Sequence, residues 1–537
     1  MSSVGFKKFK KIHFIGIGGS GMIGIATMLQ KQGFKVSGSD ISMTEEVEQL
    51  KMLGAKIQLG HTPKLIKNAD LVVASSAILK NNLELVIART LNITVIPRAE
   101  MLGTLMKPYR SIAVAGSHGK TTTTSIIASI FNAAKLSPTY VIGGQVLSVG
   151  KSSILGAGEH MVVEADESDG SFMHLQPDVE VITNIDNDHL NFYDSSQEKL
   201  NQAFVSFAEN LPFYGHIFLN LDDVNIQKIV KSIHRKKISF GFQTRNQYQI
   251  YETSLSNGNQ NFKLLDREKK IEYQFSTRLS GKHNLYNVVA AICVALEEGI
   301  TPAKIQKGLN SFKGVGRRFE INSLEFNHKE IVLIDDYGHH PTEILATINA
   351  IKEKFPRKRF CMFFEPHRYS RTQQLFEDFV GVLKEIRREL SGTLTVNRLW
   401  THASGTRSVK GLKAAKLYET LYNDMRTGDN PLQAFARKIS GKNRDQLDIT
   451  EKKKIDGNES EVVKKDMEVP VIEFGNYDSL QDMATGLKQI TNFNDKSATF
   501  NLFKNQAIEA QKAGYKREHF VTELGEGITS LFFPEVN

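Results

Sequence analysis

The stretch SIAVAGSHGKTTTTSIIASIF, residues 111–131, decides the fold class, because an apolar strand passes through a glycine-rich turn into a hydroxyl-rich helix. A glycine-rich turn at this place points backbone N–H groups and a helix N-terminus at a phosphate. Lys120 would neutralise the β and γ phosphate oxygens, and a neighbouring hydroxyl can bind Mg²⁺. The turn is two residues shorter than the usual G-x-x-x-x-G-K-[ST] loop, and a plain strand–helix turn is the alternative. The residues that we expect to bind ATP here are Gly116, Ser117, His118, Gly119, Lys120, Thr121 and Thr122.

A second glycine loop lies near the N-terminus, in KKIHFIGIGGSGMIGIATMLQKQGFKVSGSD, residues 10–40. Gly16, Gly18 and Gly21 follow a short apolar strand and permit close approach to a diphosphate. Asp40 ends the next predicted strand, where an acidic side chain commonly binds a ribose hydroxyl. A nicotinamide dinucleotide and the diphosphate of a UDP-sugar fit such a loop equally well. The Lys120 turn favours the UDP-sugar, because a simple dehydrogenase has no use for a second phosphate site.

The rest of the chain indicates an α/β protein with several domains. Residues 11 to about 105 alternate strand and helix patterns, the βαβ rhythm of a parallel sheet, and a second α/β unit opens at residue 111. Residues 231–275 look like a β-rich insertion, and a third α/β unit begins near residue 330. After about residue 385 the pattern is hard to interpret. The stretch 440–468 is dense in both signs of charge and predicts a solvated linker or surface excursion.

Composition narrows the class of protein and its partners. The 537 residues are 40% hydrophobic and 24% charged, which is typical of a soluble globular protein. The net charge of +9 suits an anionic partner, but the Lys and Arg residues are scattered, which argues against nucleic acid. Cys293 and Cys361 lie far apart and form no metal-type pair, which fits a reducing compartment. The apolar run 12–29 contains five glycines and a histidine, so we expect no export signal, no membrane insertion and a cytoplasmic location.

Carboxylates gather at the ends of two further apolar strands, in VVEADESDGSF and ITNIDNDHLNFY. The carboxyl ends of parallel strands surround the ligand crevice, so these groups could converge on the phosphates held by Lys120 and help to bind Mg²⁺. A solvated turn is the alternative for the acidic cluster, and a hydrogen-bonded structural histidine is the alternative for His189. The polar residues of the two segments are Glu164, Asp166, Glu167, Asp169, Asp186, Asp188 and His189.

Two more groups of polar residues follow. Asn284 and Asn287 lie one helical turn apart in GKHNLYNVVAA and could bind the edge of an adenine, although a helix N-terminal cap fits the spacing equally well. The segments DDYGHHPTE and PHRYSRT place histidines and arginines at strand ends, where the arginines suit carboxylate or phosphate binding. A His-rich metal site is the rival interpretation, but the spacing is not typical of zinc. The clustered residues are His339, His340, His367, Arg368 and Arg371.

Together these segments resemble the Mur ligase family, the ATP-dependent amide-forming enzymes of peptidoglycan assembly. The resemblance covers residues 11 to about 385, and Ser117 stands where the family usually has threonine, keeping the hydroxyl. The segments that carry it, in order, are HFIGIGGSGM, VSGSD, GSHGKTTTT, EADESDGSF, TNIDNDH, NLPFYG, GKHNLYN, GVGRRFE, DDYGHHPTE and PHRYSRT.

The resemblance implies an α/β fold in the three-domain Mur ligase architecture. Residues 1–105 would form a Rossmann-like domain for the UDP-sugar, and residues 106–318 a central P-loop-type ATPase domain. Residues 319–385 would start a C-terminal Rossmann-like domain. The strand–helix units that the family has after PHRYSRT find no recognisable counterpart, so we expect residues 386–537 to form a divergent region and the third domain to be incomplete or altered.

The resemblance also implies the reaction, in which L-alanine is joined to the carboxylate of UDP-N-acetylmuramate with ATP and Mg²⁺. The carboxylate oxygen would attack the γ-phosphoryl group to give an acyl phosphate, and the amine of alanine would then displace phosphate. Such phosphoryl transfer depends on positioning and on charge neutralisation.

The roles that the resemblance implies divide by ligand. Lys120 would stabilise the γ-phosphate, and two Mg²⁺ ions would be held by Thr121, Glu164 and His189. Adenine would be bound by Asn284 and Asn287, the ATP ribose by Asp336, and the phosphates also by Arg318 as the domains close. The amino acid and the sugar-nucleotide carboxylate would be oriented by His339, Arg368 and Arg371. The residues expected to bind the UDP-sugar are Gly16, Gly18, Gly19, Ser20, Gly21, Asp40, His61 and Ser75.

Three other functions are consistent with parts of the sequence. A sibling ligase would join a recycled peptide, instead of free alanine, to the same sugar nucleotide. An NAD-dependent oxidoreductase would bind nicotinamide at the first glycine loop and would have no use for Lys120. A binding protein without catalysis is suggested only by the C-terminal region.

Overall fold

The computed structural model describes residues 6–147, 151–256, 258–326, 329–356, 359–365, 371, 374–389, 451–455, 458–462 and 527–533. It divides into two compact units, Met1–Gly316 and Arg317–Asn537, each with an apolar core of its own. Of the predicted site residues, Arg368 lies outside the described residues, as does His367. In the described part of the chain, no helix is both long and apolar enough to span a membrane.

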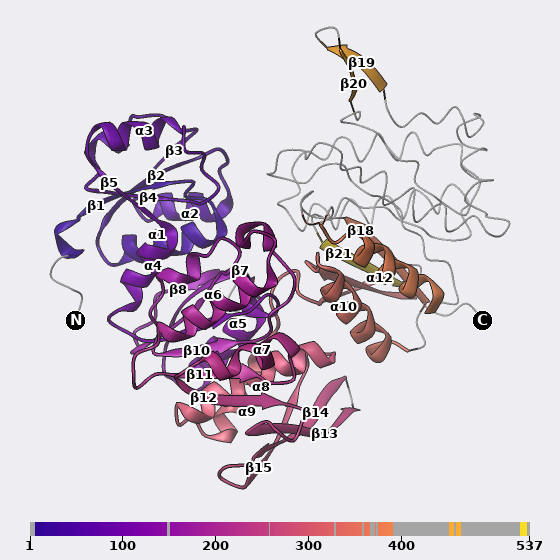
Figure 1. Cartoon of the computed structure of the whole chain (residues 1–537). Coiled ribbons are helices and arrows are strands. Elements are labelled where there is room, and N and C mark those ends of the chain that lie inside the picture. The colour runs from indigo at the N-terminus through magenta and orange to yellow at the C-terminus, as the bar shows by residue number, and fades with distance from the viewer. Residues whose placement is uncertain are drawn as a thin grey trace. The chain divides into compact units, whose positions relative to one another are not determined.

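The first unit begins with a sheet of five parallel strands in the order β3-β2-β1-β4-β5, as predicted for residues 11 to about 105 (Figure 1). Its strands are β1 (Lys11–Ile15), β2 (Lys35–Asp40), β3 (Lys56–Leu59), β4 (Leu71–Ala74) and β5 (Thr94–Pro97). Its helices are α1 (Ser20–Lys31), α2 (Glu45–Met52), α3 (Leu83–Thr90) and α4 (Arg98–Met106), with 3-10 turns η1 (Phe6–Lys8) and η2 (Ile66–Asn68).

Helices cover both faces of this sheet, which is why its strands are apolar on both sides. Ile12 and Phe14 of β1 belong to the core under α1, α2 and α4. Ile15, on the opposite face, packs with residues of α3 and η2. Successive residues of a strand point to opposite faces, so β1 contributes to both cores and lies at the centre of the sheet.

The central sheet has ten strands in the order β15-β14-β13-β12-β11-β10-β6-β9-β7-β8. All neighbouring strands from β13 to β7 pair in parallel, whereas the β13-β14, β14-β15 and β7-β8 pairs are antiparallel. The predicted β-rich insertion at 231–275 therefore extends the edge of this sheet. The strands are β6 (Arg110–Ala115), β7 (Thr139–Val146), β8 (Lys151–Ile154), β9 (His160–Glu164), β10 (Val179–Ile182), β11 (His216–Asn220), β12 (Lys236–Gly241), β13 (Tyr248–Ser256), β14 (Asn259–Asp266) and β15 (Ile271–Thr277).

Two layers of helices enclose the central sheet. One face is covered by α5 (Lys120–Ala133), α8 (Lys282–Glu297) and α9 (Pro302–Ser311). The other is covered by α6 (Gln197–Glu209) and α7 (Val224–Ile229), with η3 (Ser171–His174), η4 (Leu190–Tyr193) and η5 (Val230–Ser232). The core on this second face continues into the first sheet's helices, and α1 packs against β7 and β8. Gly24 makes this contact possible, since a Cβ there would lie 3.0 Å from the Ser153 Cβ.

The second unit contains a four-stranded sheet in the order β16-β17-β21-β18, and every pairing in it is antiparallel. Its elements are β16 (Glu320–Phe326), β17 (Lys329–Asp336), α10 (Pro341–Lys354), β18 (Arg359–Glu365), α12 (Phe376–Glu389) and β21 (Gly527–Phe533). A Rossmann-like sheet would continue with parallel strands, so this sheet is altered. The reason is that β21, from near the C-terminus, lies between β17 and β18 and runs against both.

The predicted linker at 440–468 contains a pair of strands. β19 (Glu451–Ile455) and β20 (Asn458–Val462) form an antiparallel hairpin. Lys452–Lys454 pair with Glu459, Ser460 and Glu461, so opposite charges lie across the hairpin. Cross-strand pairs of opposite charge favour such pairing. A charge-rich segment can thus form strands without an apolar core of its own.

Candidate active site

The turn between β6 and α5 depends on glycine at two positions. Gly116 has φ +127° and Gly119 has φ +85°, both in the region that favours glycine. A Cβ on Gly116 would lie 2.2 Å from Thr183 Oγ1, and a Cβ on Gly119 would lie 2.2 Å from Asn287 Oδ1. Gly119 is also the N-cap of α5 and provides no side-chain cap for the first N–H groups of the helix. These N–H groups and the close-fitting turn form a suitable cradle for an anion.

Lys120 opens α5, and its ammonium group lies within the turn. The Nζ atom donates to Glu167 Oε2 at 2.8 Å and to the carbonyl oxygen of Gly116 at 2.6 Å. Burial lowers the pKa of Lys120, but the negative charges of Glu167, Asp166 and Glu164 outweigh it and raise the pKa above its usual value. Lys120 therefore stays charged next to the anion cradle.

The carboxylates around Lys120 come from β9 and the segment after it, as predicted. Burial, with the charge of Asp166, raises the pKa of Glu167 to about 7, although Lys120 opposes the rise. For Asp166, burial raises the pKa, but Lys120, hydrogen bonds from Ser168 and the charge of Arg98 lower it overall. Glu167 is thus the member of the pair that takes up a proton first as the pH falls.

Glu164 and Thr121 lie against two consecutive glycines of β7. A Cβ on Gly143 would be 2.8 Å from Glu164 Oε2, and a Cβ on Gly144 would be 3.1 Å from Thr121 Cγ2. Gly143 therefore leaves room in front of the Glu164 carboxylate, and Gly144 leaves room beside the methyl group of Thr121. A carboxylate and a hydroxyl are oxygen ligands of the kind that Mg²⁺ prefers. His189, the third expected ligand, follows β10 and lies 3.3 Å from the Asp188 carboxylate.

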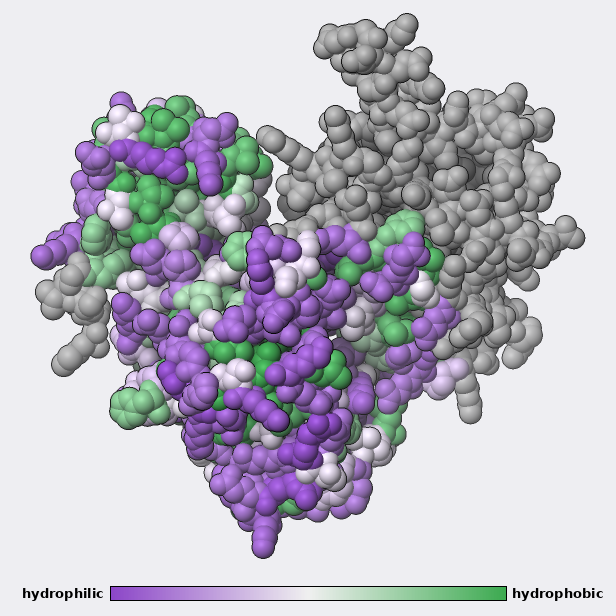
Figure 2. Space-filling view, in the orientation of Figure 1, coloured by the Kyte–Doolittle hydropathy of each residue, from purple (hydrophilic) through white to green (hydrophobic). Residues whose placement is uncertain are grey.

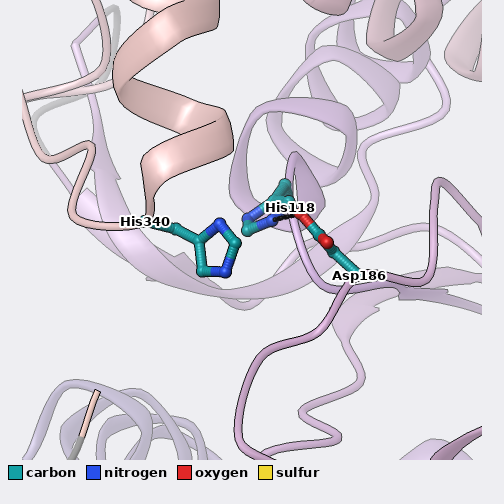
Figure 3. Close-up of side chains that lie close together, drawn as sticks. All are labelled: His118, Asp186 and His340. Atoms are coloured by element: carbon teal, nitrogen blue, oxygen red, sulfur yellow. Dashed lines mark hydrogen bonds and ion pairs between the residues drawn. The ribbon is translucent and has the colours of Figure 1, made fainter. Parts of the chain in front are cut away.

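Hydrogen bonds join the turn after β6 to the loop after β10 (Figure 3). His118 Nε2 lies 2.8 Å from Asp186 Oδ2. The Ser117 hydroxyl accepts from the Asp186 N–H at 2.8 Å and donates to the Asp186 carbonyl at 3.3 Å. The side chains of Ser117 and His118 thus fix the two loops to each other, and the contribution of these residues to an anion site would come from their backbone.

Asn284 and Asn287 are both buried near the start of α8. The Asn284 amide donates to the carbonyl of Ser280 at 2.8 Å, while Asn287 lies 3.5 Å from Asn284 Oδ1. Asn287 also packs against Gly119, so the structure brings this residue to the phosphate turn. Adenine binding by the two amides stays a prediction.

The first glycine loop, between β1 and α1, is held by Asp40. The Asp40 carboxylate accepts from the Gly18 N–H at 2.7 Å and from the Ser42 N–H at 3.1 Å. Ser75, at the end of β4, is brought to the loop, since a Cβ on Gly16 would be 3.2 Å from the Ser75 Cβ. The structure therefore gathers the predicted residues of this loop at the carboxyl ends of β1, β2 and β4.

Arg98 and Glu84 in the first unit were missed in the sequence. The Arg98 guanidinium lies beside the first turn of α1, because a Cβ on Gly21 would be 2.6 Å from its Nη1. Arg98 directly follows β5, so the rule that picks polar residues at strand ends could have found it. Glu84 lies within α3 and is buried, and no local sequence signal distinguishes it from the other acidic residues of surface helices.

In the second unit, Arg318 and His339 lie against Glu343, and Asp336 and Arg371 are charged neighbours of this group. Arg318 Nη1 is 3.6 Å from Glu343 Oε1, and the His339 N–H donates to Glu343 Oε2 at 3.0 Å. Burial lowers the pKa of His339 to about 3, with Arg371 and Arg318 adding to the effect and Glu343 opposing it. Glu343, which the sequence did not single out, is therefore the counter-charge of this cluster.

Asp336 and His340 have structural partners within the second unit. Asp336 accepts from the Phe319 and Gly338 N–H groups, each at 2.7 Å, and burial raises its pKa to about 6 despite Arg318. His340 lies at the start of α10 (Figure 3) and caps it. Its ring Nδ1 accepts from the Thr342 N–H at 3.3 Å.

Three family models match the chain in succession. They are described as Mur ligase family, catalytic domain (residues 11–110), Mur ligase middle domain (114–295) and Mur ligase, glutamate ligase domain (317–445). The chain belongs to the Mur ligase family. The middle-domain match begins in β6 and includes the Lys120 turn with its carboxylates. Members of this family are ATP-dependent amide ligases of peptidoglycan synthesis.

Solved structures of three such ligases are similar to this chain. UDP-N-acetylmuramate-alanine ligase MurC from Thermotoga maritima is 28% identical with a TM-score of 0.63, over 77% of this chain and 88% of its own. A murein peptide ligase from Psychrobacter arcticus is 25% identical with a TM-score of 0.57, over 67% and 79%. The UDP-N-acetylmuramate:L-alanyl-gamma-D-glutamyl-meso-diaminopimelate ligase from Neisseria meningitides is 27% identical with a TM-score of 0.53, over 57% and 100%.

Proposed function

We propose that this Mur ligase joins L-alanine to the carboxylate of UDP-N-acetylmuramate, using ATP and Mg²⁺ and passing through an acyl phosphate. The observation that carries the proposal is the Lys120 turn, a glycine cradle whose lysine is surrounded by carboxylates within a Mur ligase middle domain. Alanine as the acceptor is supported by the similarity to the alanine ligase of Thermotoga maritima, which has a higher TM-score than the two peptide ligases.

On the ATP side, Lys120 would exchange its contacts with Glu167 and Gly116 for contacts with the γ-phosphate. The N–H groups at the start of α5 would bind phosphate oxygens in the same cradle. Thr121 and Glu164, with the space that Gly143 leaves, would hold Mg²⁺ together with His189. When bound, Mg²⁺ neutralises phosphate charge and orients the transferring group.

On the acceptor side, His339 and Arg371 would orient the amino acid and the sugar-nucleotide carboxylate, while Arg318 would reach the phosphates of ATP. His339 is uncharged near neutral pH because its pKa is about 3, so it would act by hydrogen bonding and would be a poor general base. Arg371 supplies the positive charge that a carboxylate requires. Asp336 would contribute to ATP binding after exchanging at least one of its backbone partners.

The test is a coupled assay of phosphate release by the purified full-length chain. Release should require ATP, Mg²⁺, UDP-N-acetylmuramate and L-alanine together, and mass spectrometry should find the sugar nucleotide heavier by one alanine residue. Absence of product with every acceptor, or NADH binding at the first glycine loop without any use of ATP, would contradict the proposal.

A second candidate is a ligase that adds a peptide to the same sugar nucleotide. The similarity to two peptide ligases, at 25% and 27% identity, favours this second candidate over an oxidoreductase. The same assay separates the two ligases, with the tripeptide L-alanyl-γ-D-glutamyl-meso-diaminopimelate in place of alanine. A kcat/KM for the tripeptide above that for alanine would identify the chain as a peptide ligase.

A further inference from the structure

Glu84 is the centre of a buried hydrogen-bond network in the first sheet domain. Its carboxylate has no exposed surface, and neither has the side chain of His13. Oε1 lies 3.2 Å from His13 Nε2 and accepts from Gln58 Nε2 at 3.0 Å. Oε2 accepts from the hydroxyl of Ser39 and lies 3.0 Å from His61 Nδ1. A helix carboxylate thus joins side chains from β1, β2, β3 and the loop after β3.

The network determines which nitrogen of His61 carries a proton. Burial raises the pKa of Glu84, but the hydrogen bonds from His13, Ser39 and His61 outweigh it and lower the pKa below its usual value, so Glu84 is an anion. A carboxylate can only accept, so the Ser39 hydroxyl donates its hydrogen to Glu84. The same hydroxyl oxygen must then accept from His61 Nδ1, 2.9 Å away. His61 Nδ1 therefore faces two acceptors and holds the proton, which leaves Nε2 with a lone pair in the neutral ring.

His61 lies where a bound nucleotide would place its base. The glycine loop follows β1, Asp40 ends β2, and His61 follows β3 by two residues, in the order in which the three strands adjoin. A diphosphate at the first position and a ribose at the second, as in nucleotide-binding sheets of this type, would bring the base to the third. The His61 side chain is 20% exposed, and among the described residues its Nε2 has no hydrogen-bond partner.

Two exposed apolar side chains lie at the carboxyl ends of β2 and β3, close in sequence to Asp40 and His61. Ile41 follows Asp40 and is 79% exposed, and Leu59, which pairs with Asp40 in the sheet, is 62% exposed. Figure 2 shows that hydrophobic residues gather on the visible face of this first domain. At the end of β2 and β3, these two exposed side chains would form a platform for the flat face of a base, since binding would remove their surface from water.

We propose that Glu84 is a positioning residue that fixes His61 as a hydrogen-bond acceptor, and that His61 Nε2 then selects uracil over cytosine on the platform of Ile41 and Leu59. This inference rests on the proposed use of a UDP-sugar. Uracil has an N–H at N3 that can donate to Nε2. Cytosine has a lone pair at N3, which would face the lone pair of Nε2, so its hydrogen bond is lost.

The probes are UDP and CDP, with dissociation constants measured by calorimetry at pH 8, where an ordinary histidine is neutral. We expect the wild-type chain to bind UDP at least about tenfold more tightly than CDP, the difference that one unpaired buried polar group typically makes. In Glu84→Leu no oxygen remains to accept from His61 Nδ1, so the ratio should fall toward one. Gln58→Met is the matched control, since it removes a donor to Oε1 and leaves the contact between Oε2 and His61 intact.

Equal affinity of the wild-type chain for UDP and CDP would overturn the inference, as would an unchanged ratio in folded Glu84→Leu. If Glu84→Leu does not fold, His61→Phe takes its place, because it keeps a flat ring but lacks the acceptor and should also lose the ratio. The ligase assay on the same preparation separates the two proposals. Turnover of UDP-N-acetylmuramate without preference for UDP refutes only the base selection, whereas preference for UDP without turnover refutes only the ligase reaction.

Discussion

The two glycine turns of the first unit have the same framework and different chemical surroundings. In each, a glycine with positive φ directly follows a parallel strand and a helix begins within five residues, at Gly16 before α1 and at Gly116 before α5. Lys120 stands at the start of the second helix, with buried carboxylates around it. The first turn has no ionisable side chain of its own, and Asp40 holds it through the Gly18 N–H.

This difference teaches that a glycine turn determines where an anion can lie and its neighbours determine what happens to it. Backbone N–H groups at a helix start bind a phosphate without activating it. A charged lysine beside carboxylates that can hold Mg²⁺ provides the neutralisation that phosphoryl transfer requires. We therefore assign binding to the first turn and chemistry to the second, and four changes test this division.

The largest effect is expected from Lys120→Ala. Removal of a preorganised charge partner of the transferring phosphoryl group typically costs about 10²–10³ in rate, so alanine-dependent phosphate release should fall to background. UDP affinity should stay unchanged, because Lys120 belongs to the other turn. Lys304→Ala on the exposed face of α9 is the control and should behave as wild type. Turnover of the Lys120 variant near the wild-type rate would contradict the assignment of the chemistry to the second turn.

The next largest effect is expected from a glycine of the second turn, compared with a glycine of the first. In Gly116→Ala the alanine would have to adopt φ +127°, and its Cβ would lie 2.2 Å from Thr183 Oγ1, so the turn must distort. The backbone conformation alone would cost about 1–3 kcal/mol, and the clash adds to this cost. We expect ATP binding to weaken by about 10²-fold and the Tm to fall. Gly19→Ala is the matched change in the first turn, where the nearest atom is the Gly16 carbonyl oxygen at 3.5 Å. Calorimetry with ATP and thermal melts of both variants test this prediction. An equal loss of ATP affinity and an equal fall in Tm in the two variants would contradict it.

A smaller effect is expected from Asp40→Ala, which removes the acceptor of the Gly18 and Ser42 N–H groups. Loss of a charged hydrogen bond of this kind should raise the KM for UDP-N-acetylmuramate about tenfold, with kcat and the KM for ATP unchanged. Asp70→Ala is the control, because Asp70 accepts from the Lys10 and Lys11 N–H groups at 2.8 Å but precedes β4, at the opposite edge of the same sheet. A rise in the KM for ATP would show that the two turns are not separate sites.

The sequence predicted the α/β framework of the first unit because parallel strands buried on both faces leave unambiguous apolar runs. β1 and β6 are such runs, and each is followed directly by a glycine with positive φ. The pairing of β21 between β17 and β18 could not be predicted, since it joins residues that lie between 162 and 200 positions apart, and neither hydropathy nor turn chemistry specifies such a partner. For the same reason the predicted insertion at 231–275 gave no sign that it extends the central sheet.

In the site, residues at strand ends were predictable and their partners were not. Lys120 and Glu167 follow apolar strands, so the topology alone brings them to one edge. Glu84 and Glu343 lie in helices, and their importance arises only from the side chains that the fold places around them. Ser117 was expected to bind ATP as part of the turn, and its hydroxyl is hydrogen-bonded to Asp186, because the loop after β10 offers it both a donor and an acceptor.

The smallest effect concerns pH and the second turn only. Burial raises the pKa of Glu167 from 4.5 to about 7, so the folded chain holds this proton more tightly than the unfolded chain does. The resulting stability is fully present below about pH 4.5 and is lost as the pH rises through about 7. Glu167→Gln cannot titrate at this position, so the Tm of wild type relative to the variant should fall by a few degrees between pH 5 and pH 8 in melts without ligand. Asp40, in the first turn, serves as the comparison, and Asp40→Asn should leave that pH dependence intact. A parallel course of the wild-type and Glu167→Gln curves would mean that Glu167 stays ionised throughout, held by Lys120.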